Sequence, residues 1–184
     1  MLSLVDYIKI YPNVLSDDVC DSFIRYFEES TDKFNFKNPI MDFTQMGLEN
    51  HSSIKKEYNH LNDLINETYL RYRKDVIGKF PSDTIIEPPR LKKYEPNTGI
   101  FDWHTDAHGG PKTQGRTLIL LWYLNTVREG GETEFRIGDD ILSLKPNKGT
   151  VLCFPPFFMY PHRGTIPISE PKYVISSYIN YISK

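Results

Sequence analysis

The sequence lacks the features that mark several classes of protein. Its 2 cysteines, Cys20 and Cys153, do not make a disulfide framework or a zinc knuckle, so we expect a reducing compartment. A formal net charge of -2 gives no electrostatic reason to expect binding to nucleic acid. No run approaches the ~20 apolar residues of a membrane span, and the N-terminal stretch lacks the apolar segment of a signal peptide. We therefore predict a cytoplasmic protein that binds neither nucleic acid nor membrane.

Internal repeats and low-complexity linkers are equally absent. The chain has 184 residues, of which 39% are hydrophobic and 25% charged, as in an ordinary globular protein. This length, without a linker, favours a single domain over residues 1–184. The sequence leaves the oligomeric state open.

The first 80 residues show the spacing of amphipathic helices. Ser16 precedes two acidic residues and an apolar set on one helical face, which predicts a helix capped by Ser16. A second helix is predicted from about His51 to Val76, because apolar residues between Tyr58 and Tyr72 form one stripe. The stretch between the helices, from residue 31 to 50, mixes aromatic residues with turn formers and is predicted to be irregular. Residues 1–80 are thus expected to give helical support to the rest of the domain.

Residues 85–184 instead consist of short runs broken by glycine, proline and asparagine, as at Gly130-Gly131. Many short strands at regular spacing are typical of a β-sandwich or barrel. With the helices packed outside it, the predicted fold class is mainly β with N-terminal helices (α+β). The candidate strands cover residues 90–94, 117–124, 133–137, 141–144, 150–154 and 173–181.

The stretch FDWHTDAHGG, residues 101–110, concentrates side chains that bind metals. In an extended segment, His104 and Asp106 point to the same face and can share one ion. Such a pair is often only a polar surface turn, so the metal site needs a third ligand, for which His162 is the candidate. Two imidazoles and one carboxylate on one side of a metal leave the opposite positions open, as in non-haem Fe(II) oxygenases.

Lys172 opens the apolar strand at the C-terminal end. A buried lysine is rare unless it is paired, so this position calls for an anionic partner inside the barrel. Tyr94 and Tyr123 lie on other candidate strands and offer hydroxyl groups to the same anion. In the alternative interpretation, Lys172 reaches solvent and the tyrosines only fill the interior.

The residues alone leave two other functions open. A zinc hydrolase also uses two histidines and a carboxylate, but it needs a general base, typically a Glu beside a ligand, and it leaves Lys172 unexplained. A non-catalytic barrel that binds a metal or a peptide is the second alternative. The presence of all three candidate ligands and of the lysine argues against the non-catalytic barrel.

Five blocks follow one another in a specific order through the second half of the chain. They run from Tyr94 to Asp106, Arg116 to Asn125, Gly130 to Phe135, Lys145 to Phe154 and His162 to Lys172. The segments YLN and GGETEF within them are far more specific than a histidine and an aspartate at this spacing. In order and spacing the blocks resemble the prolyl 4-hydroxylase group of 2-oxoglutarate- and Fe(II)-dependent dioxygenases.

This resemblance implies a double-stranded β-helix (jelly-roll) core over residues 85–184, with the metal at one end of the barrel. His104, Asp106 and His162 would bind Fe(II) and be the catalytic centre. The implied enzyme is a dioxygenase that hydroxylates an unactivated C–H bond while 2-oxoglutarate is decarboxylated to succinate.

The resemblance also implies how the co-substrate is bound. Lys172 would pair with the distal carboxylate of 2-oxoglutarate, helped by Tyr123, with Tyr94 near the metal end. Fe(II), 2-oxoglutarate and O₂ are thus the implied cofactors, and ascorbate is a further candidate. The chain departs from the group at Tyr178, where tryptophan is frequent six residues after the basic anchor.

The implied substrate is a prolyl residue of a peptide or protein. The same chemistry on another residue or on a small molecule is the alternative. The segment 107–115, with the irregular stretch from 33 to 50, is expected to grip substrate. We expect the loop 107–115 to become ordered on binding, with His108 as a loop residue.

Overall fold

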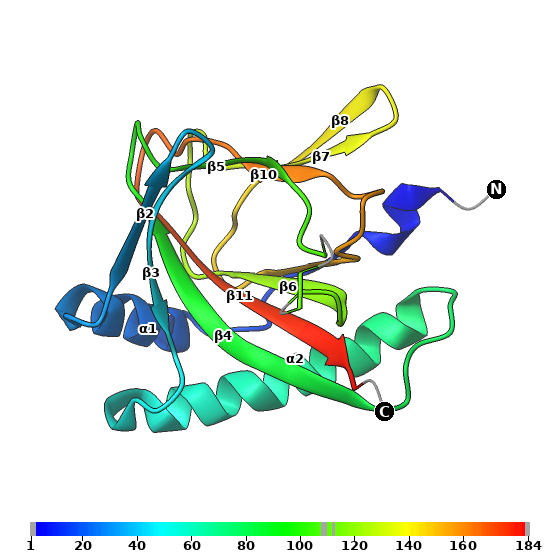
Figure 1. Ribbon diagram of the computed structural model, residues 1–184. Coiled ribbons are helices and arrows are strands. Elements are labelled where there is room, and N and C mark those ends of the chain that lie inside the picture. Colours follow the sequence, from blue (N-terminus) through cyan, green and yellow to red (C-terminus); the bar gives the residue numbers. More distant parts are fainter. Residues whose placement is uncertain (1–2, 108–109, 112, 183–184) are drawn as a thin grey trace.

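The computed structural model describes residues 3–107, 110–111 and 113–182, and we refer to these as the described residues. The two main helices lie within the first 75 residues, and the described elements that follow them are all strands, as Figure 1 shows. In chain order they are η1 (Leu4–Tyr7), β1 (Lys9–Tyr11), α1 (Asp17–Glu29), β2 (Phe34–Asn38), β3 (Met41–Gly47), η2 (Ser52–Ile54), α2 (Lys55–Asp75), β4 (Thr84–Tyr94), β5 (Ile100–His104), β6 (Arg116–Tyr123), β7 (Thr133–Ile137), β8 (Asp140–Leu144), β9 (Val151–Phe154), β10 (His162–Gly164) and β11 (Lys172–Tyr181).

The strands form one curled antiparallel sheet. Within the described residues it is 11-stranded and runs β1-β9-β6-β11-β4-β3-β5-β10-β7-β8, with β2 paired to β3. The pairing of β3 with both β4 and β5 turns the sheet back over itself, so that β5 and β10 lie across from β6, β11 and β4 (Figure 1). Crossovers between strands far apart in sequence give the double-stranded β-helix, which confirms the predicted fold class.

Strand β6 shows how the two cores are separated. Leu118, Leu120 and Trp122 face the layer of helices and belong to one buried cluster. Ile119 and Tyr123 alternate with them and belong to a second cluster inside the barrel. Because both faces are buried, the strand is almost entirely apolar.

Both predicted helices are present on the outer face of the sheet (Figure 1). The side chain of Ser16 accepts a hydrogen bond from the backbone N–H of Val19 at 3.4 Å, as expected of an N-cap. Phe23 and Phe27 are buried against the sheet. The second helix starts after a short 3₁₀ turn, and its predicted stripe packs on the same face of the sheet.

The prediction that residues 31–50 are irregular is wrong in one respect. Residues 34–47 form the hairpin of β2 and β3. Apolar and polar residues alternate from Phe34 to Lys37, as in a strand, but this short run lies among turn-forming residues, and all residues of β2 are exposed. β3 is nevertheless essential to the architecture, because it joins β4 to β5.

The six predicted strands are all present, with ends shifted by a few residues. The predicted turn at Gly130 and Gly131 has φ values of 73° and 72°, a left-handed conformation that favours glycine. A Cβ on Gly130 would lie 2.3 Å from the carbonyl oxygen of Ile166, so no other residue fits there. Strands β1, β5 and β10 were not predicted; β1 and β10 have only three residues each, and β5 contains the mixed sequence IFDWH.

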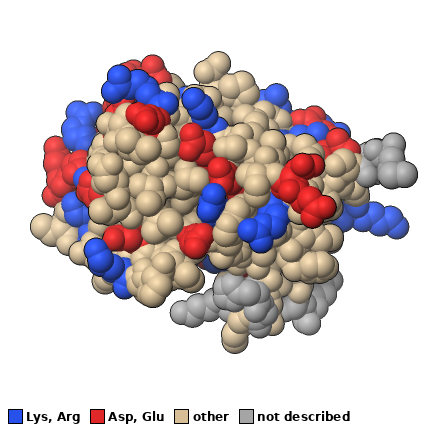
Figure 2. All heavy atoms as spheres, turned by 90° about the horizontal axis from the view of Figure 1, so that it is seen from above, with Lys and Arg blue, Asp and Glu red and all other residues tan. Residues whose placement is uncertain are grey.

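The surface agrees with the low net charge. Figure 2 shows acidic and basic side chains intermixed over the face that it presents. Among the described residues, no helix combines the length and the apolar character needed to cross a membrane.

Both cysteines are fully buried, which generates a prediction. Burial raises the pKa of Cys20 to about 11 and also raises the pKa of Cys153. Because the thiolate is the reactive form, we expect neither thiol to react with a disulfide reagent at about pH 8 in the folded protein. Two thiols should react after unfolding in guanidinium chloride. Labelling of the folded protein at the unfolded rate would contradict this burial.

Candidate active site

The three predicted metal ligands converge at one end of the barrel. His104 is the last residue of β5 and His162 is the first of β10, and the two are register partners in the antiparallel ladder. Asp106 follows β5 and is held by its backbone N–H, which donates to the carbonyl of Pro156 at 3.2 Å. One ligand atom from each of the three side chains lies within 4.8 Å of the others. The fold therefore brings all three together, inside the molecule rather than on a surface turn.

Hydrogen bonds fix which nitrogen of each imidazole faces the centre of the site. His104 Nδ1 lies 2.7 Å from the carbonyl oxygen of Asp102, and His162 Nδ1 lies 3.1 Å from that of Tyr160. A carbonyl only accepts, so each Nδ1 carries the proton and each Nε2 keeps a lone pair. The rings are also packed, with Phe101 stacked on His104 at 3.6 Å between centroids.

The charges at this centre suit a bound cation. His162 Nε2 lies 3.2 Å and His104 Nε2 4.0 Å from Oδ2 of Asp106, so acceptor lone pairs face one another. Burial, with the neighbouring His162, lowers the pKa of His104 to about 3, which keeps that imidazole neutral. Burial acts to raise the pKa of Asp106, but its contact with His162 and the nearby His104 and Lys92 hold that pKa well below its usual range. Two imidazole nitrogens and a carboxylate oxygen are a fitting donor set for Fe(II).

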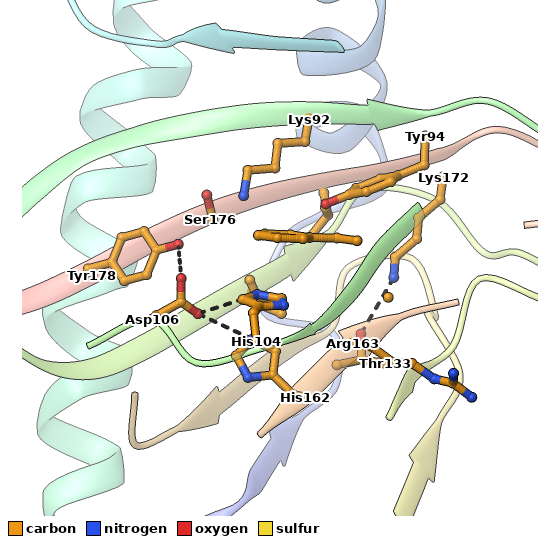
Figure 3. Close-up of a pocket in the computed structure, with 14 residues that line it drawn as sticks. Lys92, Tyr94, His104, Asp106, Thr133, His162, Arg163, Lys172, Ser176 and Tyr178 are labelled. Carbon is orange, nitrogen blue, oxygen red and sulfur yellow. Dashed lines mark hydrogen bonds and ion pairs between the residues drawn. The ribbon is translucent and has the colours of Figure 1, made fainter. Parts of the chain in front are cut away.

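The other oxygen of Asp106 is held from outside the cluster. Tyr178 on β11 donates its hydroxyl to Oδ1 at 3.1 Å, and Arg116 Nη1 lies 3.5 Å from the same oxygen. Arg116 also donates to the backbone carbonyl of Asp106 and forms two hydrogen bonds with Glu87. Oδ1 is thus occupied while Oδ2 faces the histidines (Figure 3). Tyr178, at which the sequence departs from the prolyl 4-hydroxylase pattern, therefore contacts a predicted ligand.

A buried lysine lies at the other side of the same pocket. Lys172, at the start of β11, is 3% exposed, and its Nζ lies 3.5 Å from the Thr133 hydroxyl oxygen. Its pKa is lowered to about 7, chiefly by burial. The rings of Tyr94 and Tyr123 lie 5.7 Å and 5.4 Å from Nζ. The lysine is therefore inside the barrel, as predicted, rather than reaching solvent.

Thr133 is a site residue that the sequence did not single out. Tyr94 lines the pocket, whereas Tyr123 lies behind Thr133 and donates its hydroxyl to the threonine at 2.7 Å. Thr133 thus stands between Tyr123 and the pocket. In the sequence, only its position after Gly130-Gly131 in the GGETEF segment could have pointed to Thr133 as a residue of the pocket. Three positions of the predicted substrate loop, His108, Gly109 and Lys112, lie outside the described residues.

Comparison with known proteins identifies the family. The sequence profile of the 2OG-Fe(II) oxygenase superfamily matches residues 89–180, half of the chain, including His104, Asp106, His162 and Lys172. The chain therefore belongs to the 2OG-Fe(II) oxygenase superfamily, whose reaction uses Fe(II), 2-oxoglutarate and O₂. This membership favours an oxygenase over the zinc hydrolase. No curated protein sequence matches the chain.

Several solved structures share the fold. A prolyl hydroxylase from Trichoplax adhaerens, in complex with a peptide fragment of the hypoxia inducible factor oxygen degradation domain, aligns with a TM-score of 0.79 at 15% identity, over 96% of this chain and 84% of that chain. A viral collagen prolyl hydroxylase from Paramecium Bursaria Chlorella virus-1, in complex with 2-oxoglutarate, aligns with a TM-score of 0.69 at 21% identity, over 96% and 97% of the two chains. A Pseudomonas putida prolyl-4-hydroxylase aligns at 0.71 and 14% identity, over 96% and 94%. At these identities the likeness shows the common fold.

The contact between Tyr178 and Asp106 generates a prediction. Tyr178→Phe removes one hydrogen bond to Oδ1 and leaves the ring in place, so the carboxylate is less well oriented. We expect metal affinity, measured by titration with Co(II), to fall on the order of 10-fold. Tyr181→Phe, on the exposed end of the same strand, is the matched control and should bind like the wild type. Equal affinities for all three proteins would contradict a positioning role for Tyr178.

Proposed function

We propose that this protein is a dioxygenase that hydroxylates a prolyl residue of a peptide or protein, with His104, Asp106 and His162 as its Fe(II) ligands. Lys172 is proposed to bind the distal carboxylate of 2-oxoglutarate. The observation that carries the proposal is the combination, in one pocket, of a converged His-Asp-His cluster and a buried cationic lysine. The structural likeness to three prolyl hydroxylases supports the choice of substrate.

Each of these residues has a specific task in the proposed reaction. Bound iron would supply the oxygen activation and the oxidation of the C–H bond. The two Nε2 atoms and Oδ2 leave one side of the metal position open toward the pocket, on which Lys172 and Thr133 lie. Lys172 offers a point charge and Thr133 a hydroxyl, which together orient an anionic chain that ends at the lysine. The apolar cluster around Phe135 and Phe154 limits the access of water to the ligands.

Succinate formation is the first test of this function. Purified protein with Fe(II), ascorbate, 2-oxoglutarate and proline-rich peptides should form succinate, and the peptide should gain one oxygen atom by mass spectrometry. His104→Ala should lose this turnover by at least about 100-fold, because the metal loses a ligand. Circular dichroism must show that the variant is folded. If folded, iron-loaded wild-type protein forms no succinate with any peptide, the non-catalytic barrel becomes the better interpretation.

Lys172 generates a prediction about pH. Since its pKa is about 7, the ammonium is lost as the pH rises above that value, and each further unit removes about nine tenths of the charged form. We expect the KM for 2-oxoglutarate to rise on the order of 10-fold between about pH 7 and about pH 8.5. Lys172→Arg keeps its charge throughout this range and should show a flatter profile. Identical profiles for the two proteins would argue against Lys172 as the anion-binding group.

A further inference from the structure

A second buried lysine lies in the pocket. It belongs neither to the His-Asp-His cluster nor to the proposed anion site at Lys172. Lys92 is on β4, two residues before Tyr94 and on the same face of the strand. Its side chain is 8% exposed and lines the pocket that contains the metal cluster. Figure 3 shows it extending from β4 into the pocket on the side of Asp106 and Tyr178, whereas Lys172 lies toward the opposite side.

The ammonium group of Lys92 makes no hydrogen bond or ion pair with any described residue. Its Nζ lies over two aromatic rings, 5.2 Å from the ring centroid of Phe43 and 5.4 Å from that of Phe101. The next residue, Lys93, faces outward and has two carboxylates, of Glu28 at 3.2 Å and Glu95 at 2.8 Å. Among the described residues, the lysine outside the barrel therefore has carboxylate partners and the one inside it has none.

The Lys92 side chain is largely buried, so its ammonium loses much of its water and gains only the weaker attraction of aromatic faces, which is costly. Burial accordingly lowers the pKa of Lys92 to about 8. The electrostatic influence of Asp106 is the main one that opposes this effect, so Lys92 lies within range of the metal end. A lysine in such a position calls for an anion, and none of the described residues supplies one within ion-pairing distance.

The sum of the charges in the pocket also indicates that Lys92 needs an anionic partner. Under the proposed function, a divalent metal and Lys172 balance Asp106 and the dianion 2-oxoglutarate, so these four sum to zero. Arg163, which also lines the pocket, is already paired with Glu134 at 2.7 Å. Lys92 then remains as one positive charge inside the barrel. A carboxylate beside it would provide both the acceptor and the missing charge.

We propose that Lys92 is a second carboxylate-binding residue of this pocket, at the metal end and distinct from Lys172. The inference rests on the proposed function. The carboxylate has two possible sources: the 1-carboxylate of 2-oxoglutarate, which lies at the metal, or a carboxylate carried by the primary substrate. The two sources share the same chemistry and differ in which ligand loses affinity when the charge of Lys92 is removed.

Binding of co-substrate analogues distinguishes the first source. Calorimetry with Mn(II)-loaded protein would use 2-oxoglutarate and 2-oxovalerate, which has a methyl group in place of the distal carboxylate. If Lys92 binds the 1-carboxylate, Lys92→Met should weaken both ligands by about 10-fold, the effect of one charge-assisted hydrogen bond. Lys172→Met should weaken 2-oxoglutarate alone. Lys93→Met, the adjacent outward-facing lysine, is the matched control and should weaken neither.

Pairs of substrates that differ in one carboxylate test the second source, a carboxylate of the primary substrate. Proline-containing peptides with glutamate or glutamine beside the proline, and free proline against prolinamide, would be titrated into protein loaded with Mn(II) and 2-oxoglutarate. If the carboxylate belongs to the substrate, the wild type should prefer the acidic member of a pair by about 10-fold. Lys92→Met should lose that preference while binding 2-oxoglutarate normally.

The outcomes separate this inference from the proposed function. If Lys92→Met binds both analogues and both members of every pair as the wild type does, while Lys172→Met loses 2-oxoglutarate, the role of Lys92 is overturned and the function stands. If the wild type itself does not bind 2-oxoglutarate in the presence of metal, the function fails instead. Thermal unfolding without ligands is a further readout, because removal of an unpaired buried charge should not lower the Tm of Lys92→Met. A clear loss of Tm would mean that Lys92 stabilises the fold and would count against a ligand-binding role.

Discussion

In an antiparallel ladder, two residues directly opposite each other are close enough for their side chains to touch. His104 and His162 form such a pair at the end of the barrel, with ring centroids 4.2 Å apart. A slip of one residue between β5 and β10 would turn one of the rings to the other face of the sheet. The register therefore brings the two imidazoles together. Asp106, whose backbone is held by Pro156 just beyond β5, completes the candidate metal site. The pairing of β3 with both β4 and β5 in turn brings this half of the sheet over the other.

The interior of the barrel contains more charge than an apolar core, and the chain compensates only part of it. Asp106 is surrounded by His162, Tyr178 and Arg116, and Glu87 in turn holds Arg116. The two inward-facing lysines have no carboxylate within ion-pairing distance among the described residues. Their positions on two adjacent strands, β4 and β11, supply positive charge along the pocket. This division suggests a binding site whose electrostatics are completed by anionic ligands rather than by the protein.

Much of the fold was predictable from local patterns. The cap at Ser16, the apolar stripes of both helices and the turn at Gly130 are set by interactions within a few residues, and each is found in the structure. The hairpin of β2 and β3 was not predicted, because its short alternating run from Phe34 to Lys37 lies among turn-forming residues. The short strands β5 and β10 were not predicted either, because their pairing depends on partners distant in sequence.

At the candidate site, the sequence by itself determined which chemistry was available: the ligand types, their spacing as His-x-Asp, the distal histidine and an unusual lysine in an apolar strand. These are properties of residue type and order, so they can be read without coordinates. Only the three-dimensional structure shows which oxygen of Asp106 faces the histidines, that Thr133 lies between Tyr123 and the pocket, and that Tyr178 contacts Asp106. It also shows that Lys92 points inward with no ion-pair partner in the described part of the chain. Such contacts join strands that are far apart along the chain. They depend on register and on side-chain packing in three dimensions, for which a single sequence contains no local signal.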